Sequence, residues 1–153
     1  MGVGSAVVLG ALELVYAENL PIGRIALFPY PQQRPEGTTK EAFQAQYRKT
    51  ILSTSGFAVF VSGNRLEPGS KTAVVAPGVI EEFEIATQLG KIPIPLGASG
   101  WAAQQIWQQV SKEPNRYYGT TDVTAQLKVL GEAGRGNNEY IAAMFEMIDK
   151  LGR

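Results

Sequence analysis

FAVFVSGNRLEPGSKTAVVAPGVIEEFE (residues 57–84) contains the two elements around which we expect the fold to be organised. Its first part, Phe57–Ser62, is a short apolar run with β-branched residues, which is typical of a strand buried on both faces of a parallel sheet. Pro77-Gly78 opens a second element whose apolar residues recur at helical spacing. Carboxylates occupy its first two turns, where they suit the positive end of a helix. A strand, a polar loop and a helix are therefore predicted in that order.

The polar residues of this stretch fall where an α/β protein binds its ligands. In open α/β sheets, ligands occupy the crevice beyond the carboxyl ends of the strands. The turn Gly63-Asn64 follows the strand, a loop carries Arg65 and Lys71, and the helix carries Glu81-Glu82. A nucleotide-like ligand is expected there. We expect the Lys71 side chain to be exposed to solvent and not to contact this ligand.

The rest of the chain alternates between helical and strand-like patterns, which is the signature of a parallel sheet with crossover helices. We predict one domain, residues 1–153, with an α/β, Rossmann-like three-layer fold and a mainly parallel sheet. The central helix is expected to end near Gly90. Thr39 is expected to cap the helix that begins at Lys40. Prolines in the third strand predict that it is short or at an edge. The other expected helices span 6–18, 40–55, 101–112, 123–130 and 138–151, the strands 24–30 and 91–96, and a loop 114–121.

Composition excludes several classes of function. The 153 residues carry 14 basic and 14 acidic side chains, so the net charge is zero and offers no general attraction to nucleic acid or anionic lipid. The chain has no cysteine and no histidine, which removes the usual zinc sites and nucleophile–base pairs, and we predict no metal and no cofactor. No apolar run approaches the roughly 20 residues of a membrane-spanning helix. A cytoplasmic protein without a membrane partner is expected.

The residues Gly2-Val3-Gly4-Ser5 precede the first expected helix. Unpaired N–H groups at such a helix start form an anion site, so Gly4 and Ser5 are candidate phosphate contacts. A plain tight turn is the alternative, because Gly-x-Gly alone is a weak signal. A glycine-rich helix start normally follows a strand, and here the sequence shows none before it.

Five pieces of the chain match one known family: GVGSAVVLGALE at 2–13, ALFPYPQ at 26–32, QYRKTILSTSGFAVFVSGNR at 46–65, GVIEEFEIA at 78–86 and IPIPLGASGWAAQQIW at 92–107. On these pieces the chain resembles the SLOG domain, of the STALD type, at the carboxyl end of Thoeris antiphage defence effectors. This domain is related to the LOG and DprA nucleotide-binding folds. The resemblance implies a non-enzymatic sensor for a cyclic ADP-ribose isomer made by a partner TIR enzyme, which activates a sirtuin-like NADase domain.

Carried over by position, the resemblance implies ligand contacts from Arg48 of QYR, Arg65 of GNR and a glutamate of GVIEEF. We favour Glu82 over Glu81 for a ribose, because the related LOG motif keeps its second glutamate. The flanking Gly63, Asn64 and Gly78 complete the predicted site. Arg48 and Arg65 are both expected at element ends rather than in the core.

Two departures from the family matter. The family usually has lysine where this chain has Arg65, which keeps the charge but changes the geometry. The family's opening strand, helix and second strand precede the GVGS loop, and we expect this chain to lack them. Its first expected strand, Arg24–Tyr30, would then present an open edge, so pairing with a second chain is expected, as in a homo-oligomer.

Two other functions stay open. A LOG-like nucleotide phosphoribohydrolase needs a Gly-Gly-x-Gly-Thr loop, whereas this chain has Pro77-Gly78-Val79-Ile80. The missing glycines would prevent close backbone approach to phosphate, so we predict no catalytic residue. The third possibility is a free-standing protein that sequesters a nucleotide signal.

Overall fold

In a computed structural model of the chain, residues 3–19, 28, 33 and 35–152 are described. The backbone divides into two compact units, residues 1–43 and 44–153. The first unit contains helix α1, Val3–Ala17. This helix begins before Gly4 and Ser5, so both lie inside its first turn and not in a loop ahead of it. The strand expected at 24–30 lies outside the described residues, apart from Phe28, which has no regular structure.

Helix α2, Lys40–Ser53, begins as the sequence predicts. The Thr39 side-chain oxygen accepts a hydrogen bond from the Ala42 backbone N–H at 3.2 Å. This bond satisfies one of the donors that a helix start leaves unpaired. The predicted cap is therefore confirmed.

The described sheet is built on two parallel strands, β1 (Phe57–Val61) and β4 (Ile92–Leu96). Their register runs from Phe57 opposite Ile92 to Val61 opposite Leu96. Two residues of β4, Pro93 and Pro95, are fully buried although neither can donate to a ladder. Within the described residues β4 pairs only with β1, which agrees with the short or edge strand expected from the prolines.

The segment after β1, expected as a polar loop, forms a β-hairpin. Strands β2 (Asn64–Leu66) and β3 (Ala73–Val75) pair antiparallel, with Arg65 opposite Val74. The loop prediction was wrong because three-residue strands are too short to show an alternating pattern. The one indication of a strand in this segment was the run of apolar residues Ala73-Val74-Val75.

Helix α3, Pro77–Gln88, follows the hairpin, and the 3-10 turn η2, Gly97–Ser99, links β4 to α4, Trp101–Lys112. The predicted bounds of α4 are confirmed. The expected loop at 114–121 is wrong at its start, because α5 occupies Pro114–Tyr118. Proline at the first position favours such a short helix, since its missing N–H is unpaired there anyway. The chain ends with α6, Thr124–Gly131, and α7, Asn137–Leu151.

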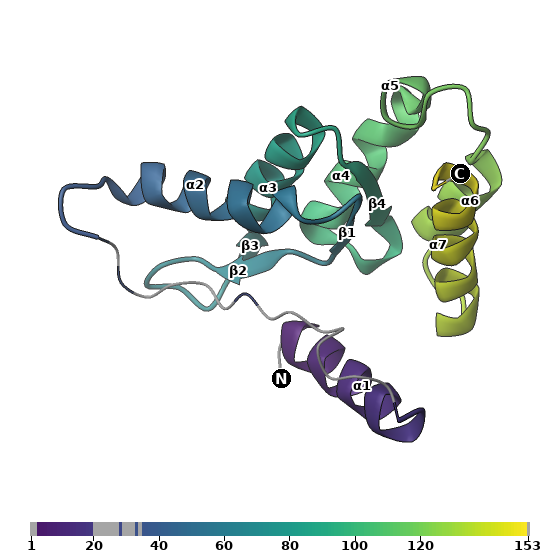
Figure 1. Cartoon of the computed structure of the whole chain (residues 1–153), viewed down its shortest axis with the longest axis horizontal. Helices are drawn as coiled ribbons and strands as arrows, with labels where there is room; N and C mark the ends of the chain where they lie inside the picture. Colours follow the sequence, from purple (N-terminus) through teal and green to yellow (C-terminus); the bar gives the residue numbers. More distant parts are fainter. Residues whose placement is uncertain (1–2, 20–27, 29–32, 34, 153) are drawn as a thin grey trace. The chain divides into compact units, whose positions relative to one another are not determined.

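The core of the second unit lies between the parallel strands and the helices around them. Helices α3 and α4 contact both strands and each other, whereas α5, α6 and α7 contact β4. Figure 1 shows α6 and α7 as an adjacent pair, which agrees with their mutual contacts. Fully buried side chains fill this core, namely those of Phe83, Ile94, Ile106, Val110, Val123, Leu130 and Met147.

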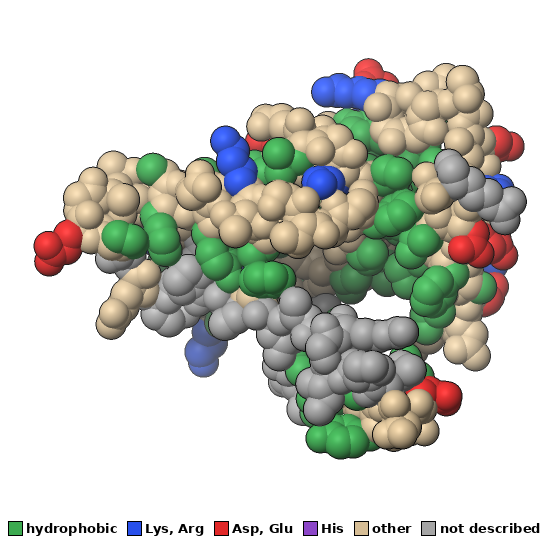
Figure 2. All heavy atoms as spheres, in the orientation of Figure 1, with side chains coloured by type: hydrophobic (Ala, Val, Ile, Leu, Met, Phe, Trp, Pro, Cys, Tyr) green, Lys and Arg blue, Asp and Glu red, His purple; other side chains and the backbone are tan. Residues whose placement is uncertain are grey.

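The described chain is thus a mixed α/β protein with a small parallel sheet. On the face that Figure 2 shows, lysine and arginine side chains of the described residues stand apart from one another and do not form a continuous patch. Among the described helices, none combines the length and the apolar character needed to cross a membrane.

Candidate functional site

The carboxyl ends of β1 and β4 meet the starts of helices α3 and α4. The Ser62 backbone N–H donates to Ser99 Oγ at 2.7 Å, which ties the end of β1 to the turn after β4. The Ser62 carbonyl accepts from the N–H of Ala103 in α4, and the Gly63 carbonyl accepts from the N–H of Ala76 before α3. These bonds fix one edge of the sheet, where parallel α/β proteins bind their ligands.

Gly63 lies at the centre of this junction. Its φ of +91° is a backbone conformation that glycine adopts without strain. A Cβ at this position would lie 2.7 Å from the Ala102 Cβ and 3.2 Å from both Val79 γ-carbons. The first turns of α3 and α4 therefore approach the end of β1 only because residue 63 has no side chain.

Arg48 contacts the site from helix α2, in a way that the sequence did not indicate. It lies inside the helix and is 6% exposed, so the expectation of a position at an element end was wrong. Its Nη1 lies 2.7 Å from Glu81 Oε2, and its Nε lies 3.4 Å from Glu82 Oε1. The two glutamates of α3 make the buried position possible, because a buried cation needs charged partners.

Gly78 adjoins the same guanidinium group. A Cβ on Gly78 would lie 2.7 Å from Arg48 Nη2, so the arginine passes directly over the first turn of α3. Burial raises the pKa of Glu82 above its ordinary value of 4.5, and the opposing attraction of Arg48 only partly offsets this. The cluster of Arg48, Gly78, Glu81 and Glu82 thus brings four of the predicted site residues together.

The remaining predicted residues are placed differently. Asn64 and Arg65 are exposed and follow one another on β2, so their side chains extend from opposite faces of the hairpin. The Asn64 side-chain oxygen accepts a hydrogen bond from the Ser62 hydroxyl at 3.4 Å. Gly4 and Ser5 belong to the first unit and are not placed relative to this edge.

Sequence reasoning did not assign Ser99 to the site. Its hydroxyl donates to the Leu96 carbonyl and accepts from the Ser62 N–H, so it bridges the ends of both parallel strands. The available signal was the small-residue turn Gly97–Gly100 directly before a helix. A turn of this kind at the ligand edge should be counted with the site.

The site provides hydrogen-bond donors and carboxylates, but no metal centre is found among the described residues. Within residues 3–19, 28, 33 and 35–152, no group of three or more metal-ligating side chains occurs. The arginine and the helix start can meet anionic oxygens, and a carboxylate can accept from hydroxyl groups. Such a pairing suits a phosphorylated sugar.

Comparison with known proteins shows to which family the chain is related. The sequence model of the Sir2- and TIR-associating SLOG family, STALD, matches residues 1–151. The chain is 33% identical over 99% of its length to an NAD(+) hydrolase ThsA from Cytobacillus dafuensis, covering 31% of that protein. It is 33% identical over 93% of its length to an NAD(+) hydrolase ThsA from Bacillus cereus (strain MSX-D12), covering 28% of it. The chain therefore spans less than a third of these relatives, and it belongs to the Sir2- and TIR-associating SLOG family.

Proposed function

We propose that the chain is a ligand-sensing domain of Thoeris antiphage defence that binds a cyclic ADP-ribose isomer. The signal would come from a TIR enzyme, and its binding would activate a sirtuin-like NADase domain. The family's association with Sir2 and TIR proteins supports this pairing. The relatives are called NAD(+) hydrolases, and we assign that hydrolysis to a part of them outside the matched third.

The observation that carries the proposal is the cluster around the first turn of α3. Arg48 is held between Glu81 and Glu82 over Gly78, beside the carboxyl ends of two parallel strands. In the proposed complex the ligand phosphates meet Arg65 and Arg48, and Glu82 accepts from ribose hydroxyl groups. Arg48 holds Glu82 in place for that contact.

We also propose that the domain has the Rossmann-like three-layer fold of nucleotide-binding proteins, in which helices cover both faces of a mainly parallel sheet. The parallel pair β1 and β4 forms part of its sheet, and α3 provides a crossover helix. Helix α1, with Gly4 and Ser5 in its first turn, would bring its N-terminal N–H groups to the phosphates. We also propose that the domain works as a homo-oligomer.

Calorimetry with purified protein tests the sensor function. A panel of ADP-ribose, NAD and cyclic ADP-ribose isomers should give one cyclic isomer that binds more tightly than the two linear compounds. Equal and weak binding of the whole panel would contradict a sensor for this class of signal. Binding without any effect on an NADase partner would instead favour a protein that sequesters the signal.

The rival from the enzyme class is a nucleotide phosphoribohydrolase. Val79 in α3 stands where the hydrolase loop has its second glycine, and Val79 packs against Gly63 in the site junction. We therefore expect no release of free base from nucleoside monophosphates. Steady turnover that depends on Glu82 would overthrow the sensor proposal.

A further inference from the structure

A pocket of about 380 Å³ lies at the amino end of β4, at the opposite end of α3 from Gly78. Along α3, Thr87 of the pocket lies nine residues after Gly78 and five after Glu82, which correspond to about 13 Å and about 8 Å of helix. Its volume is within the usual range for small-ligand sites, about 300–1,000 Å³. The residues that line it are Thr87, Gln88, Gly90, Lys91, Ile92, Arg116 and Tyr117.

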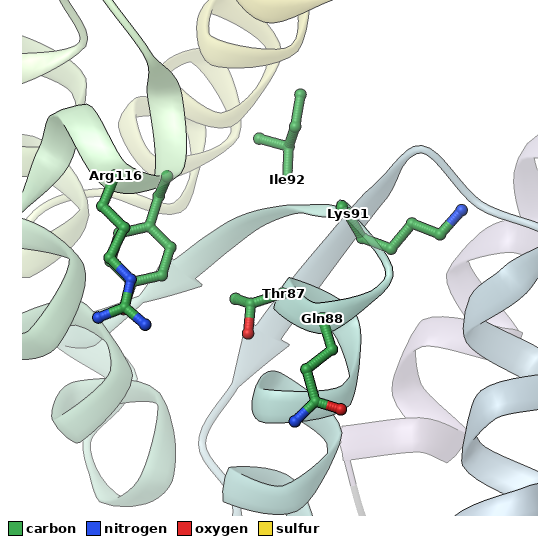
Figure 3. Close-up of a pocket in the computed structure, with 7 residues that line it drawn as sticks. Thr87, Gln88, Lys91, Ile92 and Arg116 are labelled. Carbon is green, nitrogen blue, oxygen red and sulfur yellow. The ribbon is translucent and has the colours of Figure 1, made fainter.

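The lining is positively charged. It contains Lys91 and Arg116 and no carboxylate. Figure 3 shows Arg116, Thr87 and Gln88 around the pocket, whereas the Lys91 ammonium group extends away from Arg116. Lys91 Nζ donates to the Ser53 carbonyl at 3.2 Å, so Arg116 is the cation available to an anion in the pocket.

Arg116 can change partners at little cost. Its Nη1 lies 3.3 Å from Glu113 Oε2, and the two side chains are 67% and 62% exposed. Exposed ion pairs of this kind contribute little to stability. A phosphate that accepts two parallel hydrogen bonds from the guanidinium group would replace Glu113.

The carboxyl end of α3, which would ordinarily repel an anion, is closed by hydrogen bonds. The left-handed turn at Gly90, with φ of +68°, brings the Lys91 amide back onto the Ala86 carbonyl. Fewer unpaired carbonyls reduce the negative potential there. The bonds run from the N–H groups of Leu89, Gly90 and Lys91 to the carbonyls of Ile85, Thr87 and Ala86.

Tyr117 supplies a fixed aromatic surface beside this arginine. Its ring centroid is 5.7 Å from that of Phe83, and its hydroxyl accepts from Gln109 Nε2 at 3.0 Å. The Arg116 guanidinium carbon lies 5.5 Å from the Tyr117 ring centroid. A flat ring that enters the pocket can therefore stack close to the group that holds its phosphate.

We propose that this pocket is a second ligand site, which takes a small molecule with one flat ring and one phosphate, such as a mononucleotide. Arg116 binds the phosphate, Tyr117 contacts the ring, and the Thr87 hydroxyl accepts a hydrogen bond while it donates to the Glu84 carbonyl at 2.8 Å. The volume is near the lower limit for ligand sites, which favours a mononucleotide over a dinucleotide.

The test is a titration of the ¹⁵N-labelled chain with AMP, adenosine and inorganic phosphate, each alone, followed by NMR. AMP should shift the amides of residues 87–92 and 116–117 at a concentration at least tenfold lower than either fragment needs. Arg116→Gln should raise the Kd for AMP at least tenfold. The matched control is Lys112→Gln, an exposed cation at the end of α4 outside the pocket, which should change the Kd less than twofold.

Three results would overturn the proposal. AMP shifts confined to residues near Gly63 and Gly78 would place its binding at the other end of α3. Equal Kd values for phosphate and AMP would remove the role of the ring. Equal effects of Arg116→Gln and Lys112→Gln would reduce the interaction to general charge attraction.

Discussion

Arg48 differs from Arg65 because it stabilises the fold in addition to its proposed contact with the ligand. Its guanidinium group joins α2 to two carboxylates of α3 at 2.7 and 3.4 Å. Arg65, in contrast, is exposed on β2 and has no ion pair within the described part of the chain. The two arginines should therefore respond differently to removal.

We expect Arg48→Ala to lower the free energy of unfolding by about 1–3 kcal/mol, because it leaves two partly buried carboxylates without their cation. Arg65→Ala should change it by less than about 0.5 kcal/mol, as exposed substitutions usually do. Urea denaturation at neutral pH measures both values. An Arg48→Ala variant as stable as Arg65→Ala would show that the ion pairs contribute nothing to the fold.

Glu82 should give the stability a specific pH dependence. Burial, the largest influence, raises its pKa in the folded state above the ordinary value of 4.5, despite the opposing effect of Arg48. Between pH 4.5 and this raised pKa, the folded state binds more protons than the unfolded state. The free energy of unfolding therefore falls as the pH rises through that interval. The difference between wild type and Glu82→Gln, measured by denaturation at successive pH values, should decline above pH 4.5 and then level off. A difference that grows with pH would mean that attraction to Arg48 outweighs burial.

The sequence indicated which residues gather at the site, but it did not indicate which of them are buried or form ion pairs. Gly78, Glu81 and Glu82 follow from the helix start, and Gly63 follows from the turn after β1. The burial of Arg48 was not predictable from α2 alone, because its partners lie more than 30 positions away in the chain. Long-range pairing of charges leaves no local pattern.

At the scale of elements, the junction of β1 with α3 and α4 depends on Gly63. We expect Gly63→Ala to lower the free energy of unfolding by at least about 2 kcal/mol, through strain at positive φ and through the clash with Ala102. Gly69→Ala is the matched control, because Gly69 also has positive φ, +74°, but no atom within 4 Å of a Cβ built there. Thermal unfolding of both variants separates the two contributions. Equal losses would mean that the close approach of the helices costs nothing to disturb.

Elements with a clear apolar pattern were predictable, and those without one were not. The bounds of α4 follow from helical periodicity, the strands β1 and β4 follow from apolar runs, and Thr39 marks the start of α2. The β2–β3 hairpin and α5 span three to five residues each, too few for a period to show. Tertiary contacts decide such segments.

For the whole molecule, we expect association with a second copy. The described sheet consists of two parallel strands, with Val59 of β1 49% exposed, and parallel sheets are ordinarily covered. Light scattering at low micromolar concentration should give a mass of at least twice 16.5 kDa. A monomer that unfolds cooperatively would contradict this expectation.

The central claim is that a cyclic ADP-ribose isomer binds at the carboxyl edge of the sheet, and calorimetry of matched variants tests it most directly. Arg65→Ala should weaken binding of the preferred isomer about ten- to a hundredfold, because a charge-assisted phosphate contact is worth about 1.5–3 kcal/mol. Lys71→Ala, which removes an exposed cation between the two strands of the same hairpin, should weaken it less than twofold. Equal effects of the two substitutions, or an affinity unchanged by Arg65→Ala, would contradict the placement of the site.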